Sequence, residues 1–448
     1  MNHIEKMNKC DSCFCKWDYI LILLCFFSCL VGSTLLPVSQ CPDEGGRTLI
    51  SSWMVQHHTL PTGNEMETLV PGWGFSYALR PFLASIVGAL FQSFFSLFTS
   101  EPAFLLAGSR MCSVLSVTLC CVFCLSLGHR CFSGRYSSFL FAAFVCFLPQ
   151  VQFLGMYQNN DSLSLCAVSA MLYYLAEGFD NHWQVKTCVK LAVVLSLGAL
   201  SYYIAYSWFL MGGLFCILSV LRDREISGKA CFILHRGGLV VGICLVLAGW
   251  FFVRNAMLHE GDFLGMTAEL RSRAYLMCEG YEGVFFNYNS AKKAGHTISS
   301  LLTSGNFYFI KRSIMSFFGL FGYMSIPMSR WLYFSYYLLT VTGVINFCLH
   351  LFPKRLSCRN CFLVAIGAMA SIMTTALHIW HSYARDFQPQ GRYIITVVLF
   401  LGFLIGLGID KLGQKDNSLK KASPLFIGLL WIVLFGCAAI TTMSQMLL

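Results

Sequence analysis

Long apolar runs recur along the whole of this 448-residue chain and constrain its fold more than any other feature. Runs of about 18 or more apolar residues are long enough to cross a lipid bilayer as helices. Hydrophobic residues make up 56% of the chain and charged residues only 12%, whereas ordinary soluble domains carry roughly 25% charged residues. This composition excludes a soluble globular enzyme, a disordered regulator and a secreted disulfide scaffold. We therefore expect an all-α, polytopic integral membrane protein.

The distribution of basic residues predicts the topology. The net charge of +10 does not indicate nucleic-acid binding, because membrane proteins concentrate Lys and Arg in cytoplasmic loops. Lys6, Lys9 and Lys16 precede the first apolar run, 17–37, and place the N-terminus in the cytoplasm. If the next run, 81–98, crossed the bilayer, the later basic clusters would face outward. We therefore expect 81–98 to lie along the membrane surface.

About eleven transmembrane helices remain, and the C-terminus is then expected outside. With this topology, 18 of the 31 Lys and Arg residues lie on the cytoplasmic side. The stretch 186–221 is open to two interpretations, because its apolar part, 191–221, would be about 46 Å long as one helix. Basic residues on both flanks favour two short spans over one tilted helix. The expected spans are 17–37, 107–128, 136–156, 162–178, 186–201, 202–221, 237–257, 331–352, 361–380, 392–409 and 424–446.

Polar residues collect on the predicted outer face, at the ends of apolar helices. Asp43 and Glu44 follow the first span, and Asp161 lies in a short loop between two spans. Carboxylates in such positions are costly unless solvated or paired, and they often mark function. For Asp43 and Glu44, helix capping, catalysis and metal binding all remain open, and for Asp161 capping is the leading alternative.

Several Arg and Lys residues share this face and suggest a specific chemistry. A carboxylate can act as general base toward an acceptor hydroxyl. Guanidinium and ammonium groups can hold a phosphate leaving group and stabilise its developing charge. The combination suits transfer of a group from a lipid-linked phosphate donor whose tail stays in the bilayer.

Five motifs resemble the GT-C superfamily of membrane glycosyltransferases. They are Pro42-Asp43-Glu44, Asn159-Asn160-Asp161, Trp250-Phe251-Phe252-Val253-Arg254-Asn255, Gly261-Asp262-Phe263-Leu264-Gly265 and Gly391-Arg392-Tyr393. Within the superfamily, the chain is most similar to uncharacterised bacterial proteins of the DUF2142 type. Protein O-mannosyltransferases and aminoarabinose transferases are more distant. The resemblance covers about residues 17–410.

This resemblance implies one GT-C-like domain over 1–448. Its parts are a cytoplasmic tail 1–16, a first outer loop 38–106 with juxtamembrane helices, and a long outer loop 258–330. The implied function is inverting transfer of a sugar from a polyprenyl-phosphate donor to a hydroxyl of an extracytoplasmic acceptor (a glycan, cell-wall polymer, lipid or protein). The implied location is a bacterial cell membrane, or the endoplasmic reticulum membrane in a eukaryote, with the active site outside the cytoplasm.

The resemblance also implies roles for single residues. Asp43 maps onto the general base, and Glu44 belongs to the same acidic motif. A divalent cation, Mg or Mn, is an open alternative, with Asp43 and Asp161 as its ligands; some members need no metal. The implied contacts to the donor phosphate are Arg80, Arg254, Arg392, Lys292, Lys293 and Arg385.

Two other functions stay open at this stage. One is a secondary transporter or flippase of lipid-linked or small polar substrates, although the span centres are almost free of ionisable residues, unlike transporter sites. The other is a non-catalytic protein that binds lipid-linked sugars. Among the 22 cysteines, Cys41 and Cys278 lie in the two large outer loops, and a disulfide between them is a hypothesis.

Overall fold

The computed structural model describes residues 14–278, 290–351, 356–413 and 418–446. This part is almost entirely helical, with one short antiparallel hairpin in which Leu320 pairs with Pro327 and Phe321 with Ile326. The first half contains α1 (Lys16–Leu35), α2 (Glu44–His57), α3 (Leu83–Ser96), α4 (Pro102–Cys131), α5 (Arg135–Cys146), α6 (Pro149–Met156), α7 (Asp161–Asp180), α8 (Val185–Ala199) and α9 (Tyr206–Arg222). The second half contains α10 (Lys229–Leu258), α11 (Met266–Cys278), α12 (Ile298–Gly319), β1 (Leu320–Phe321), β2 (Ile326–Pro327), α13 (Arg330–Leu351), α14 (Cys358–Ala384), α15 (Val397–Gly413) and α16 (Ser418–Thr441).

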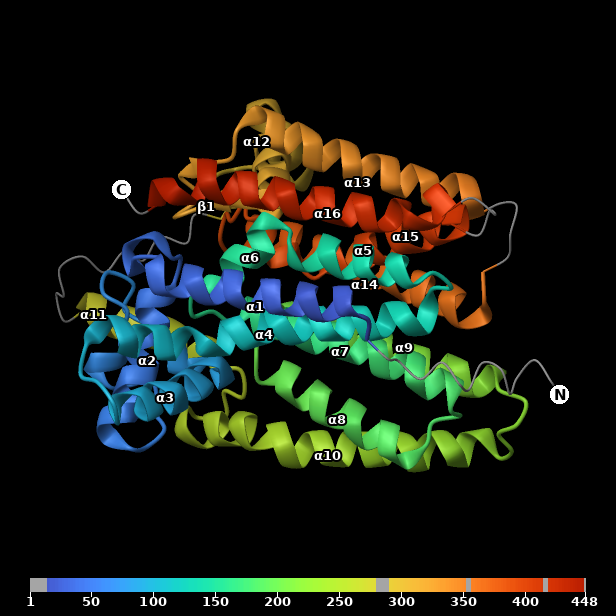
Figure 1. The fold of residues 1–448 in the computed structure, drawn as a ribbon. Coiled ribbons are helices and arrows are strands. Elements are labelled where there is room, and N and C mark those ends of the chain that lie inside the picture. Colours follow the sequence, from blue (N-terminus) through green and yellow to red (C-terminus); the bar gives the residue numbers. More distant parts are fainter. Residues whose placement is uncertain (1–13, 279–289, 352–355, 414–417, 447–448) are drawn as a thin grey trace.

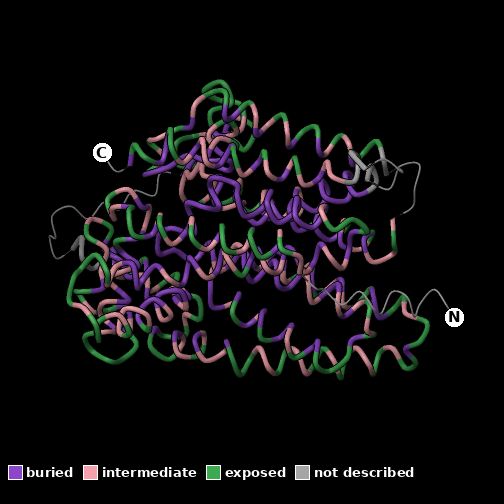
Figure 2. Tube along the Cα trace, viewed as in Figure 1, coloured by how far each residue is buried: buried purple, intermediate pink, exposed green. Residues whose placement is uncertain are grey.

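The long helices lie side by side in one bundle around α4, which packs against α1, α3, α5 and α7 (Figure 1). Helices α8 and α10 form one edge of the bundle, and α12 and α13 lie at the opposite edge. Buried residues are concentrated in α5, α6 and α7, whereas α10 is buried only near its C-terminal end (Figure 2). Helices α2, α3 and α11 gather at the left-hand end of Figure 1. This end carries the polar site described below.

Among the described residues, eight helices are long and apolar enough to cross a membrane. The pair α5 and α6 would be a ninth span, bent by 63°. The bend follows from Pro149, which lacks an amide hydrogen and begins a new helix at α6. A helix lies in each of the eleven predicted ranges, but α8 and α15 are shorter, with 15 and 17 residues. The chain is an integral membrane protein.

For two stretches, the sequence left the number of membrane crossings open, and the helix boundaries now bear on both. The stretch 186–221 forms two helices, α8 and α9, separated by a turn at Leu200–Ser201 and the short 3-10 helix Tyr203–Ala205. The stretch 81–98 forms α3, whose 14 residues extend about 21 Å. This is too short for a bilayer core of about 30 Å, and α3 packs instead against α2 and α4.

The predicted outer loop 258–330 contains ordered structure in its described part. Helices α11 and α12 and the hairpin β1–β2 lie within it. The hairpin turn contains Gly322 and Met324 at positive φ, and its Tyr323 side chain reaches the cavity described below.

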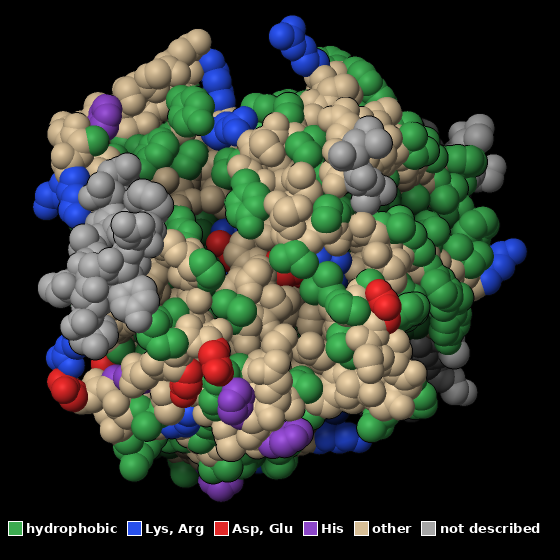
Figure 3. All heavy atoms as spheres, turned by 90° about the vertical axis from the view of Figure 1, so that its left-hand side faces the viewer, with side chains coloured by type: hydrophobic (Ala, Val, Ile, Leu, Met, Phe, Trp, Pro, Cys, Tyr) green, Lys and Arg blue, Asp and Glu red, His purple; other side chains and the backbone are tan. Residues whose placement is uncertain are grey.

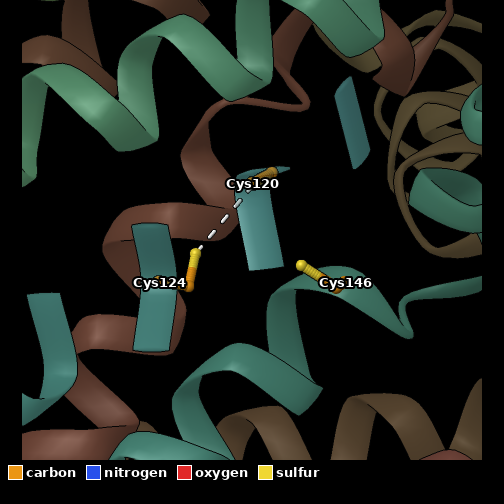
Figure 4. Close-up of side chains that lie close together, drawn as sticks. All are labelled: Cys120, Cys124 and Cys146. Carbon is orange, nitrogen blue, oxygen red and sulfur yellow. Dashed lines mark hydrogen bonds between the residues drawn. The ribbon is translucent and has the colours of Figure 1, made fainter. Parts of the chain in front are cut away.

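A cluster of buried cysteines lies in the middle of the bundle. The sulfur atoms of Cys120, Cys124 and Cys146 lie within 4.8 Å of one another (Figure 4), and Cys120 and Cys124 are 4.0 Å apart. Soft metal ions favour such ligands. However, all three side chains are fully buried in the apolar core of the bundle. We therefore interpret these thiols as small apolar groups in the core.

Candidate active site

Asp43 begins the site, at the junction between the first span and α2. It is the N-cap residue of α2 and has φ 63° and ψ −4°, in the left-handed region that Asp tolerates better than most residues. Sequence analysis left capping open for this residue. Asp43 has the cap position, but its side chain makes no capping hydrogen bond. The carboxylate is therefore available for other partners.

Arg392 is the main partner of Asp43. Its Nη2 donates a hydrogen bond of 2.5 Å to Oδ2 of Asp43, and its side chain is only 8% exposed. Arg392 belongs to the 3-10 helix Gly391–Ile394, which lies directly on α12. A Cβ atom at Gly391 would fall 2.2 Å from the backbone nitrogen of Phe317. The glycine of this motif thus permits the close approach that carries Arg392 to Asp43.

Arg47 is a second buried cation at the site, and sequence analysis did not select it. Its guanidinium lies 4.6 Å from the ring centroid of Tyr77 and 5.7 Å from that of Tyr202. The residue is 3% exposed, and its Nε has no hydrogen-bond partner among the described residues. The available signal was its spacing, because Arg47 comes four residues after Asp43 and so shares its helix face.

The two arginines determine the charge state of Asp43. Burial raises the pKa of its carboxyl group, but the charges of Arg392 and Arg47 outweigh burial, with help from the Tyr77 hydroxyl. The net result is a lowered pKa, so Asp43 is ionised at neutral pH. Burial and the neighbouring Asp43 charge raise the pKa of Tyr77 well above its usual range. Tyr77 therefore stays protonated and can donate a hydrogen bond.

Asp161 lies close enough to this group to interact with it electrostatically. The charges of Arg392, Arg47 and Asp43 all act on its carboxylate. It is 1% exposed, and its Oδ1 has no hydrogen-bond partner among the described residues. The N-cap position of α7 belongs to Asn160. Asp161 is therefore not the cap that sequence analysis favoured, but a second buried carboxylate at the site.

A cavity of about 830 Å³ opens beside Asp43. Figure 3 looks onto the left-hand end of Figure 1 and shows a hollow near the middle of this face, with acidic and basic side chains inside. The first outer loop, α11, α14 and the β1–β2 hairpin all contribute to its walls. The aromatic side chains in the walls are Trp73, Phe75, Tyr77, Tyr202, Tyr203, Tyr323, Trp380 and Tyr393.

One wall of the cavity is held together by a charged network. Glu269 on α11 accepts hydrogen bonds from Nε and Nη2 of Arg80, at 3.1 and 2.7 Å. It also accepts one from Nη2 of Arg273, at 2.7 Å. Both guanidinium groups lie over the ring of Phe75. Arg80 thus lines the cavity as the sequence suggested, and it also ties the first outer loop to α11.

The opposite wall is one face of α14. Leu377, His378, His381 and Arg385 recur at helical spacing and all line the cavity. His378 is 5% exposed and stacks on Phe309, and its Nδ1 has no hydrogen-bond partner among the described residues. Sequence analysis selected Arg385 but missed the two histidines, whose i, i+3 spacing within an apolar helix was the available signal.

Glu44, which the resemblance places in the catalytic motif, lies in a buried ion pair. It is fully buried, and it accepts hydrogen bonds from Arg110 at both oxygens, 2.8 Å from Nε and 2.5 Å from Nη2. The backbone amide of Gln158 donates a further bond of 2.7 Å to it. Because its oxygens are engaged in this way, Glu44 joins α2 to α4 rather than acting on a substrate.

Three of the predicted phosphate contacts, Arg254, Lys292 and Lys293, lie outside the cavity lining. Nη2 of Arg254 donates to the backbone oxygens of Leu60 and Pro61, so Arg254 anchors the first outer loop on α10. Lys292 and Lys293 are exposed on a turn.

Cys41 has a free thiol that donates to the backbone oxygen of Pro37. The structure therefore contains no bond from Cys41 to Cys278, whose side chain lies outside the described residues.

The pair Asp43 and Asp161 offers few free oxygens to a hard divalent cation. Such cations take about six oxygen ligands, of which Mg²⁺ usually draws only one or two from carboxylates. Within the described residues, the cysteine cluster in the core is the only group of three or more His, Cys, Asp or Glu residues with converging ligand atoms. One oxygen of Asp43 is already bonded to Arg392.

Comparison with known proteins places this arrangement in a structural context. No protein-family model and no curated protein sequence matches the chain. Solved structures do match. ArnT from Cupriavidus metallidurans bound to undecaprenyl phosphate superposes with a TM-score of 0.56 at 13% identity, over 96% of this chain and 73% of that one. The Archaeoglobus fulgidus oligosaccharyltransferase in complex with Zn and sulfate gives 0.57 at 12% identity, over 94% and 52%.

The chain has the GT-C fold. The same archaeal enzyme, AglB, in complex with an inhibitory peptide and dolichol-phosphate, also superposes, with a TM-score of 0.51 at 11% identity, over 95% of this chain and 56% of that one. This chain thus spans about half the length of the archaeal GT-C proteins. Its closer likeness to the DUF2142 type stays a prediction.

Proposed function

We propose that the protein is a membrane glycosyltransferase that moves a sugar from a polyprenyl-phosphate donor to a hydroxyl group of an extracytoplasmic acceptor. The observation that carries this proposal is an ionised Asp43, held by Arg392, in the wall of a large cavity of a GT-C fold. ArnT binds undecaprenyl phosphate and AglB binds dolichol-phosphate in their structures. These ligands support a lipid-linked phosphate as the donor.

In the proposed reaction, Asp43 acts as general base. It takes the proton from the acceptor hydroxyl while that oxygen attacks the anomeric carbon of the donor sugar. The bond between the anomeric carbon and the phosphate oxygen breaks, and its electron pair leaves with the polyprenyl phosphate. Attack from the side opposite the leaving group inverts the anomeric configuration. Asp43 is suited to this role because its lowered pKa keeps it ionised.

The leaving phosphate requires positive charge nearby. Arg392 and Arg47 are buried beside Asp43, and the Nε atoms of both lack a hydrogen-bond partner among the described residues. A phosphate oxygen would satisfy these donors and gain charge-assisted hydrogen bonds. Arg80 and Arg385 line the cavity beside Asp43 and extend the positive surface. We therefore assign the donor phosphate to Arg47 and Arg392, with Arg80 and Arg385 as further contacts.

The cavity walls suit a carbohydrate. Aromatic side chains such as Trp73 and Trp380 offer flat apolar faces, and Asp386 and Gln388 offer polar groups that can pair with sugar hydroxyls. A transporter would be expected to place ionisable groups near the bilayer midplane. Here the charged groups of the site lie at one end of the bundle, which supports chemistry at the membrane surface, outside the cytoplasm.

A turnover assay tests this proposal. The purified protein is reconstituted with a panel of radiolabelled sugar-phosphate polyprenols and membrane extracts that supply acceptors. We expect release of free polyprenyl phosphate and transfer of the label to an acceptor for at least one donor. Movement of intact donor between leaflets would indicate a flippase, and donor binding without release would indicate a binding protein. Either result would contradict the proposal.

A further inference from the structure

We propose that Arg47 and Arg392 supply the positive charge of this site, so that the centre operates without a bound metal. The role of the two arginines rests on the proposed function, whereas the test below needs neither donor nor acceptor. The archaeal oligosaccharyltransferase that shares this fold was crystallised with Zn, which raises the question of a metal at this site. Asp43 and Asp161 are of the residue type that binds such ions.

The first argument is the bonding of Asp43. Its Oδ2 accepts a hydrogen bond from Nη2 of Arg392 at 2.5 Å. A cation bound at that oxygen would have to displace a guanidinium group that is 92% buried, as its 8% exposure shows. Gly391 holds the backbone of Arg392 against α12. The displaced side chain would therefore have to rotate about its own bonds, away from the carboxylate.

The second argument is the place of Arg47. Its guanidinium is held over the rings of Tyr77 and Tyr202, and its charge acts on both Asp43 and Asp161. Cation–π contacts of this kind are stronger where water is excluded, and Arg47 is 3% exposed. The second cation of the site is thus fixed in position by packing, in addition to its attraction to the carboxylates.

The third argument is the charge balance. Two carboxylates, Asp43 and Asp161, interact electrostatically with two guanidinium groups, Arg47 and Arg392. A divalent cation would add two positive charges beside two arginines in a partly buried site, where repulsion is weakly screened. A donor phosphate instead adds the negative charge that the arginines can hold. The site favours an anionic ligand over a metal ion.

The choice of arginine has chemical consequences. A guanidinium group stays protonated at all ordinary pH values and can bind a phosphate through two parallel hydrogen bonds. It is not removed by a chelator. A centre built in this way should keep its charge at low metal concentrations and in acid, where metal ligands become protonated.

Metal analysis and thermal unfolding of the full-length protein test this inference without any donor or acceptor. Protein is purified in detergent without chelators, and its metal content is measured by mass spectrometry. We expect substoichiometric Mg, Mn, Ca and Zn, and an unchanged Tm when EDTA or millimolar amounts of each cation are added. One bound metal per chain, lost together with a fall in Tm on chelation and absent from D43N protein, would overturn the inference.

A paired variant sharpens the test. In R47M/R392M protein, the two carboxylates lose their partners and should repel each other, so Mn²⁺ or Mg²⁺ should now raise Tm. The control K293M changes an exposed lysine and should show no such rise. An equal cation-dependent rise in wild type would contradict the inference. If the double variant does not fold, the metal content and Tm of the wild-type protein still test the inference. Failure to find sugar transfer would count against the proposed function alone.

Discussion

Asp43 and Arg392 are separated by 349 positions in the sequence, yet their side chains are joined by a hydrogen bond beside the cavity that Asp43 lines. The contact connects the first outer loop to a segment that follows α14, so it depends on correct packing of nearly the whole bundle. It also keeps the candidate base ionised, because the charge of Arg392 opposes the effect of burial on Asp43.

Loss of Arg392 should shift the pH dependence of the reaction. In R392M protein, one of the two positive charges that lower the pKa of Asp43 is missing. The pKa of Asp43 should therefore rise. The acid limb of kcat/KM, which reports protonation of the base in the free enzyme, should then move to higher pH. In wild type, Asp43 contributes stability that is present above its unfolded pKa and is lost as pH falls through its lowered folded pKa. A pH–rate profile of each protein measures the shift. An acid limb at the same pH in both proteins would show that Arg392 does not lower the pKa of Asp43.

Arg47 should act mainly on donor binding. Hydrogen bonds to charged groups contribute about 1.5–3 kcal/mol, so R47M should weaken donor binding by roughly 10- to 150-fold. Binding of a fluorescent polyprenyl-phosphate analogue to nanodisc-embedded protein measures this change. K293M is the matched control, since Lys293 lies outside the cavity, and its affinity should equal that of wild type. Equal affinities in R47M and wild type would remove Arg47 from the phosphate site.

The buried pair Glu44 and Arg110 should matter for folding rather than for catalysis. Removing one partner of a buried ion pair leaves an uncompensated charge and costs about 3–5 kcal/mol. R110M should therefore lower Tm strongly. E44Q should also lower Tm, because it leaves the buried Arg110 guanidinium group without a counter-charge. The exposed pair Arg271 and Glu260 provides a control, and R271M should change Tm little. A Tm for R110M equal to that of R271M would contradict this assignment.

Sequence alone predicted the helical membrane fold well. The signals for it, the length of each apolar run and the basic residues beside it, lie close together in the chain. The division of 186–221 into α8 and α9 follows from such local signals, as does the confinement of 81–98 to the short α3. The motif glycine at 391 also marked a real constraint, although its reason, close contact with α12, is visible only in three dimensions.

Residue roles were harder to predict, because they depend on distant partners. Asp43 and Glu44 are adjacent in the sequence, but one faces the cavity and the other binds Arg110, 66 positions away. Nothing local distinguishes them. Likewise, Arg254 lies within a motif, yet its Nη2 donates to backbone oxygens of the first loop. Arg47 lies three residues after the acidic motif, but its place in the site is visible only from its contacts with the rings of Tyr77 and Tyr202.

The rate of sugar transfer by D43N protein tests the central claim most directly. The variant keeps the shape of the side chain and removes the base, so transfer per folded molecule should fall by roughly 10²- to 10⁴-fold. Loss of the ion pair with Arg392 should also lower Tm, so the rate is compared at a temperature where both proteins are folded. E101Q, an equivalent change at an exposed carboxylate, should transfer sugar at the wild-type rate. Transfer by D43N at the wild-type rate would contradict the account.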